Sequence, residues 1–192
     1  MLKLNFLIVG FGNMGMRHAQ GIIKASEILN IESNVEVLDP YLNTDDFDFS
    51  CKKVSLVEKP KKDYFSIIIS TTALYRFNAL LDIFDSNCTA KYIILEKNPF
   101  TSISQIENVE IELKNRGLYD STYVNTPFSQ INEIKQYINF ESSDLVIDIE
   151  SRNYGLLTNS IHIILPILAW GNSSILSYSS SEPAFYNAQR ES

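Results

Sequence analysis

The sequence is poor in cysteine, in histidine and in positive charge. Its 192 residues include two cysteines and two histidines, and 23 Asp and Glu residues outnumber 16 Lys and Arg residues. Two distant cysteines, Cys51 and Cys88, argue against a disulfide framework or a zinc cluster and fit a reducing cytoplasm, and no metal site is indicated. A formal net charge of −7 argues against a general nucleic-acid-binding protein, which needs a basic face.

Long hydrophobic runs are also absent. The apolar run Ile161–Trp170 has ten residues, whereas a helix needs about 20 residues to span a bilayer. The N-terminal run at residues 2–9 is interrupted by Asn5 and is followed by glycines rather than by a signal-peptide cleavage site. We therefore expect a soluble, cytoplasmic protein with neither a membrane nor a nucleic acid as its partner.

The sequence does contain apolar runs typical of strands, which alternate with stretches typical of helices. The β-branched run Ile67–Ile69, for example, favours a buried strand. The strands are expected at residues 2–9, 34–38, 54–57, 64–70, 91–95 and 121–124. The helices are expected at residues 13–28, 74–84, 102–115 and 127–139. This repetition predicts an α/β fold with an N-terminal Rossmann domain, a doubly wound parallel sheet that helices cover on both faces.

The pattern changes after residue 143. A half-exposed strand, a very apolar helix and a further strand are expected at residues 145–150, 156–170 and 174–180. Pro166 predicts a kink or a break in that helix. These elements indicate a partial α+β C-terminal domain. We place the boundary near residues 125–128, which gives a Rossmann domain over 1–125 and a truncated α+β domain over 126–192.

The first strand is followed by a glycine-rich turn, VGFGNMGMRHAQ, at residues 9–20. Gly10 permits the tight turn, Gly12 lets the backbone approach a pyrophosphate, and Gly15 lets the helix pack close to the sheet. The helix N-terminus adds free amides and a partial positive charge. We predict a dinucleotide-binding turn made by Gly10, Phe11, Gly12, Asn13, Met14 and Gly15. The alternative is a strand-to-helix turn that needs small residues for its own packing.

The second strand ends in Asp39, 24 residues after Gly15. An acidic side chain there accepts hydrogen bonds from ribose hydroxyls and repels a 2′-phosphate. This favours NAD over NADP as the cofactor, although Lys52 and Lys53 lie nearby in the sequence. Further candidates for cofactor contacts are Ser70, Thr71, Thr72, Glu96 and Lys97.

Four features together resemble the Gfo/Idh/MocA family of oxidoreductases. They are GFGNMGMRH, Asp39, ILEKNPF and GLLTNSIHIILPILAW. ILEKNPF is similar to the family's strand-ending Glu-Lys-Pro motif with Asn98 inserted, and the last segment is similar to the helix that carries an Asp-x-x-x-His pair. The resemblance covers residue 2 to about residue 170. It implies an NAD(P)-dependent oxidoreductase that acts by hydride transfer on a hydroxyl or keto group of a sugar, cyclitol or nucleotide-sugar.

The resemblance also implies two catalytic residues. Lys97 takes the place of the cation that stabilises a developing alkoxide beside the nicotinamide. His162 takes the place of the histidine that transfers the proton. Thr158 stands where the family has an acidic residue, and a threonine cannot carry the negative charge that would orient His162. The structural alternatives are a solvated Lys97, a His162 packed in the core and a Glu96 that holds its loop. His18 is expected to be structural.

The family continues through a broad, mostly antiparallel sheet beneath the substrate, whereas this sequence stops after about two such strands. Three explanations are open: a piece of a longer enzyme, a homodimer through the C-terminal strands, and a short form that binds the cofactor without turnover. The functional alternative to an active oxidoreductase is therefore a non-catalytic dinucleotide-binding protein or an inactive fragment. A weaker alternative is a Rossmann domain for another adenosine ligand, such as a methyl donor.

Overall fold

A computed structural model describes residues 2–42, 54–60, 62–86, 88–126 and 161–171. The chain divides into two compact units, Met1–Asn125 and Thr126–Ser192. The expected helix at 127–139 and the expected strands at 145–150 and 174–180 lie outside the described residues.

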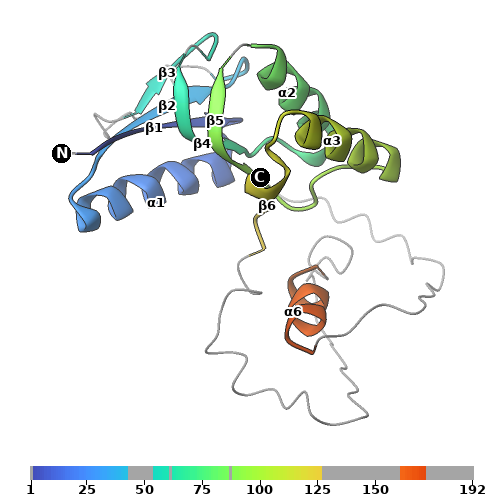
Figure 1. The fold of residues 1–192 in the computed structure, drawn as a ribbon. Helices are drawn as coiled ribbons and strands as arrows, with labels where there is room; N and C mark the ends of the chain where they lie inside the picture. Colours follow the sequence, from blue (N-terminus) through green and yellow to red (C-terminus); the bar gives the residue numbers. More distant parts are fainter. Residues whose placement is uncertain (1, 43–53, 61, 87, 127–160, 172–192) are drawn as a thin grey trace, which may run out of the picture. The chain divides into compact units, whose positions relative to one another are not determined.

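The first unit is built on a sheet of six parallel strands (Figure 1). They are β1 (Lys3–Val9), β2 (Glu32–Leu38), β3 (Val54–Leu56), β4 (Asp63–Ile69), β5 (Thr89–Leu95) and β6 (Thr122–Val124). Their spatial order is β3-β2-β1-β4-β5-β6, the order typical of a Rossmann sheet. The direction of winding reverses between β1 and β4, and ligands bind at the carboxyl ends of the strands next to such a point. The predicted parallel α/β fold is confirmed.

Helices cover both faces of this sheet because its central strands are apolar on both sides. In β1, Ile8 packs into the core that contains Ala19 and Ile23 of α1 (Asn13–Leu29). Its neighbours Leu7 and Val9 pack into the other core. That second core contains Leu80 and Ile83 of α2 (Ala73–Asp85) and Val109 and Leu113 of α3 (Ile103–Asn115). The alternation along β1 thus produces the doubly wound arrangement.

The helix boundaries follow the sequence signals closely. The hydroxyl of Ser102 caps α3 by accepting a hydrogen bond from the Gln105 amide at 3.3 Å. Gly117 follows the helix at a φ of +67°, a left-handed conformation that glycine adopts readily at the end of a helix. For α1, the helical spacing of the apolar residues predicts a face of Met14, Ala19, Ile22 and Ile23, but this is wrong at Met14, which is 39% exposed. The buried stripe of α1 consists instead of Gly15, Ala19, Ile23 and Ser26. Met14 lies one residue before this stripe, about 100° around the helix, and so points away from the sheet.

In the second unit, the structure describes α6 (Ile161–Gly171), which carries His162. The expected helix began at residue 156, and residues 156–160 lie outside the described part. The helix continues through Pro166, so of the two predicted outcomes, a kink or a break, the break does not occur. Within the described residues, no helix is both long and apolar enough to cross a membrane.

Candidate functional site

The glycine-rich turn joins β1 to α1 at the carboxyl end of the sheet, and its glycines meet different surroundings. A Cβ on Gly10, whose φ is +86°, would lie 2.8 Å from the Thr71 amide nitrogen. A Cβ on Gly15 would lie 2.3 Å from the Gly10 carbonyl oxygen, so the close approach is to the turn itself rather than to the sheet. A Cβ on Gly12 would meet nothing within 4 Å. Gly10 and Gly15 are therefore required by the fold, and Gly12 is not.

Asp39 follows β2 and braces this turn. One carboxylate oxygen accepts a hydrogen bond from the Phe11 amide at 2.7 Å, and the other accepts one from the Tyr41 amide at 3.0 Å. Sequence reasoning missed this bracing, because it assigned the carboxylate to ribose hydroxyls. Each carboxylate oxygen has more than one lone pair, so the ribose contact stays a prediction alongside the bracing role.

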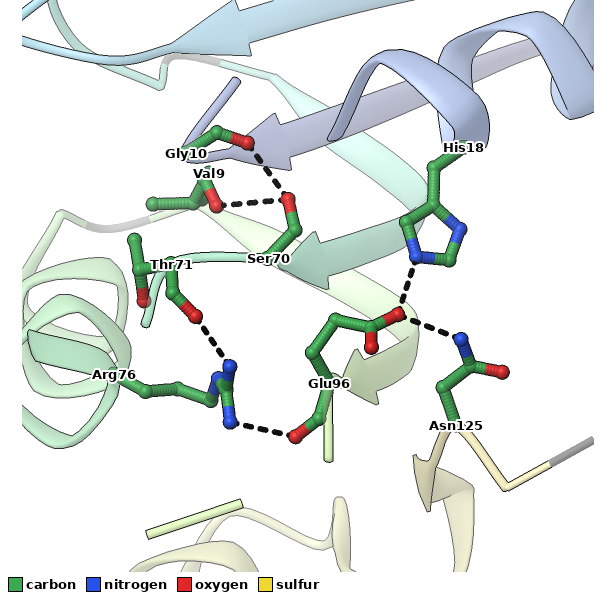
Figure 2. A network of polar contacts seen from close by, with 8 residues as sticks. All are labelled: Val9, Gly10, His18, Ser70, Thr71, Arg76, Glu96 and Asn125. Atoms are coloured by element: carbon green, nitrogen blue, oxygen red, sulfur yellow. Dashed lines mark hydrogen bonds and ion pairs between the residues drawn. The ribbon is translucent and has the colours of Figure 1, made fainter. Parts of the chain in front are cut away.

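The loop after β4 contacts the same turn. The Ser70 hydroxyl donates a hydrogen bond to the Gly10 carbonyl oxygen at 2.7 Å, and a longer one reaches Val9 at 3.3 Å (Figure 2). Thr71 packs against Gly10 from the same side. Thr72 precedes α2, and its side chain makes no capping hydrogen bond to that helix. Ser70 and Thr71 therefore fix the turn from the β4 side.

We predict that Ser70→Ala lowers the free energy of unfolding of the first unit by about 1 kcal/mol, because the turn loses a partly buried hydrogen bond. Urea denaturation followed by circular dichroism measures the change. Thr72→Ala is the control, since its side chain caps nothing and is exposed. Equal stability of Ser70→Ala and the wild type would contradict the bracing role of this hydroxyl.

Glu96 follows β5 and is only 4% exposed. One of its carboxylate oxygens is within hydrogen-bond distance of His18 Nε2, at 2.7 Å, and accepts a hydrogen bond from the Asn125 side-chain amide at 2.6 Å. Burial alone would raise the pKa of Glu96, but the hydrogen bonds from His18 and Asn125, together with the charges of His18 and Arg76, hold that pKa below its usual value. The ionised carboxylate thus ties α1, β5 and the end of β6 together (Figure 2).

Lys97 comes next and is half-buried at the end of β5, and the peptide bond between Lys97 and Asn98 is cis. His162 is half-buried on α6 and belongs to the second unit. The two predicted catalytic residues are thus placed in separate units. In the described part of the chain, no cluster of three or more His, Cys, Asp or Glu residues could hold a metal ion.

Arg76 on α2 is a residue that sequence reasoning missed. Its side chain is 2% exposed and donates hydrogen bonds to backbone carbonyls of two loops. A signal was present in the sequence, because Arg76 lies on the same helical stripe as the buried Leu80 and Ile83. An arginine on an apolar stripe indicates a buried charge with specific partners.

Comparison with known proteins gives similarity in structure alone. No protein-family model matches the chain, and no curated protein matches it. The solved structure described as a probable oxidoreductase, yhhX, matches 88% of this chain and 54% of its own at 12% identity, with a TM-score of 0.62. Scyllo-inositol dehydrogenase from Lactobacillus casei, solved with NAD(H) and scyllo-inositol, matches 88% and 56% at 16% identity, with a TM-score of 0.59. Dehydrogenase MviM from Clostridium difficile matches 88% and 57% at 13% identity, also with a TM-score of 0.59.

These solved structures are oxidoreductases of the Gfo/Idh/MocA type. The chain has their fold. The resemblance that the sequence motifs indicated is therefore confirmed at the level of the fold. The chain spans about half the length of these solved structures.

Proposed function

We propose that the first unit binds a nicotinamide dinucleotide and that the chain is an oxidoreductase. The observation that carries the proposal is the turn at Gly12. Its backbone stands open at the N-terminus of α1, while Gly10 and Gly15 on either side are closely packed. A pyrophosphate can approach the first amides of α1 at this point, where the helix has a partial positive charge. The NAD(H) bound in the structurally similar scyllo-inositol dehydrogenase supports the same assignment.

The preferred cofactor in this proposal is NAD rather than NADP. Asp39 stands at the end of β2, and its carboxylate is held beside the turn by the Phe11 amide. A negative charge there accepts hydrogen bonds from ribose hydroxyls and repels a 2′-phosphate. The contacts of Asp39 with the turn support this position for the adenosine end of the cofactor.

The reaction in this proposal is hydride transfer to or from a carbinol carbon of a sugar or cyclitol. The bound nicotinamide supplies the hydride acceptor or donor. In the oxidation direction, Lys97 donates a hydrogen bond to the substrate oxygen and stabilises its developing negative charge. His162 accepts the hydroxyl proton. The scyllo-inositol in the similar dehydrogenase supports a polyol as the substrate class.

The second candidate function is binding of the dinucleotide without turnover. Thr158 favours it, because a threonine cannot supply the carboxylate that would orient a catalytic histidine and raise its pKa.

A homodimer through the C-terminal strands is a further proposal. Light scattering on the full chain tests it, and a monodisperse monomer would contradict it.

Titration of the full chain with NADH, followed by fluorescence, tests the proposed function. We expect saturable binding that Gly12→Ala weakens at least about tenfold, because a methyl group at Gly12 occupies the space that a pyrophosphate approaches. Gly21→Ala on the exposed side of α1 is the matched control and should bind as the wild type does. Absence of NADH binding would contradict the proposal, and tighter binding of NADPH would contradict the assignment of Asp39.

A screen of sugars and cyclitols for NADH formation then separates the two functions. Turnover that Lys97→Ala abolishes supports the oxidoreductase. NADH binding with no turnover on any polyol supports the non-catalytic protein.

A further inference from the structure

We propose that Arg76 is a positioning residue that fixes the loop carrying Lys97, residues 96–99, against the loop at residues 70–72. The part of this inference that concerns cofactor binding rests on the proposed function. The geometric part concerns only side-chain and backbone contacts within the first unit.

The guanidinium of Arg76 donates to four backbone carbonyls. Its Nη1 donates to the carbonyl of Glu96 at 2.6 Å and to that of Pro99 at 3.3 Å, and also to the carbonyl of Asn98. Its Nη2 donates to the carbonyl of Thr71 (Figure 2). One planar group therefore joins the carboxyl ends of β4 and β5, and β4 is a neighbour of β1, which leads into the glycine-rich turn.

The chemistry of the guanidinium suits this position. Burial lowers the pKa of Arg76 to about 10, against the opposing effect of the Glu96 carboxylate, so the side chain stays protonated at neutral pH. A planar cation with donors on two nitrogens can contact both loops at once in a fixed geometry. The single nitrogen of a lysine can keep the charge but cannot reproduce that geometry.

Arg76 contacts the backbone of the residues directly before and after Lys97. The carbonyls of Glu96 and Asn98, on either side of Lys97, both accept from Arg76. The Glu96 side chain is held from another direction by His18 of α1. The backbone that carries Lys97 therefore cannot rotate without breaking several hydrogen bonds.

The same contacts relate Lys97 to the glycine-rich turn. Arg76 holds the Thr71 carbonyl, the Thr71 amide packs against Gly10, and the adjacent Ser70 hydroxyl donates to the Gly10 carbonyl. In the proposed function, Gly12 contacts the pyrophosphate and Lys97 lies at the nicotinamide. Through these contacts, Arg76 would hold the loop at residues 96–99 in a fixed place relative to the glycine-rich turn.

Carbon-13 NMR of the full chain, with its lysines reductively dimethylated by labelled formaldehyde, tests the geometric part. Loss of one signal in Lys97→Arg assigns Lys97. We expect Arg76→Gln and Arg76→Lys each to move the Lys97 signal, while the signals of Lys91 and Lys114 stay in place. The extra signal of Arg76→Lys is recognised by its absence from Arg76→Gln. Arg116→Lys is the matched control, because Arg116 is exposed and contacts Glu112 and Phe84 instead.

An unmoved Lys97 signal in either variant, with circular dichroism showing it folded, would overturn the inference. If Arg76→Lys leaves the signal in place, the positive charge of residue 76, rather than the planar geometry of the guanidinium, would determine the position of Lys97. If neither variant folds, Arg76 serves the fold as a whole and the inference is likewise overturned.

A double-mutant cycle on the NADH dissociation constant tests the part that depends on the cofactor. We expect Lys97→Ala to weaken binding in the wild type, and to weaken it less in Arg76→Lys, by a factor of at least about two. Equal factors in both backgrounds would contradict action through Lys97. A wild type that binds no NADH, with a Lys97 signal that still responds to Arg76, would refute the proposed function and leave the positioning role supported.

Discussion

Gly15→Ala is expected to destabilise the first unit by about 2 kcal/mol, within the range measured for overpacked sites. The new methyl group would lie 2.3 Å from the Gly10 carbonyl oxygen, a backbone atom that cannot rotate away. Either α1 or the turn must move, and the hydrogen bonds of Ser70 and Asp39 resist movement of the turn. Urea denaturation followed by far-ultraviolet circular dichroism measures the loss.

The sign of the change in stability distinguishes Gly15 from an ordinary helical glycine. Glycine to alanine inside a helix normally stabilises it by about 1 kcal/mol. Gly21 of α1 provides that comparison, because a Cβ there meets nothing within 4 Å. We expect Gly21→Ala to stabilise the unit and Gly15→Ala to destabilise it. Gly12→Ala should cost less than about 1 kcal/mol, since it changes only an N-cap without steric contact. Stabilisation by Gly15→Ala would show that α1 does not start so close to the turn.

The fold could be predicted well because its signals are local. The run Ile67–Ile69 specifies a strand buried on both faces. Ser102 and Gly117 mark the two ends of α3, and the residues that they contact lie only a few positions away in the sequence. The glycine spacing likewise locates the turn between β1 and α1. Each of these features depends on propensities and contacts within a short segment, which a single sequence contains.

The connections of the site could not be predicted, because they join residues far apart in the chain. Glu96 is 78 residues from His18, and only the order of the strands brings the two together. Arg76 contacts backbone carbonyls. Every residue has a backbone carbonyl, so the residue types of the partners do not reveal the contact. Asp39 was expected at the end of the second strand, but its hydrogen bond to the Phe11 amide, 28 residues away, has no sequence signal.

Glu96→Gln is expected to lower the free energy of unfolding by about 1.5–3 kcal/mol at pH 7, the range for hydrogen bonds that involve a charged group. The folded-state pKa of Glu96 lies below its usual value, because the contributions of His18, Asn125 and Arg76 outweigh burial. A carboxyl with a depressed pKa contributes stability above its unfolded-state pKa and loses that contribution as the pH falls through the folded-state value. Urea denaturation from pH 7 down to pH 3 measures both the cost and its pH dependence.

The difference between the wild type and Glu96→Gln should therefore shrink as the pH falls from about 5 towards the folded-state pKa, since the wild-type carboxyl then becomes neutral as well. Glu110→Gln is the control. Its partner Lys114 is an exposed residue on the same helix, so we expect little effect at any pH. A difference for Glu96→Gln that stays constant down to pH 3 would mean that the shape of the side chain, rather than its charge, joins α1 to β5. Loss of the difference below pH 5 would instead show that an ionised Glu96 holds α1 and the loop at residues 96–99 together.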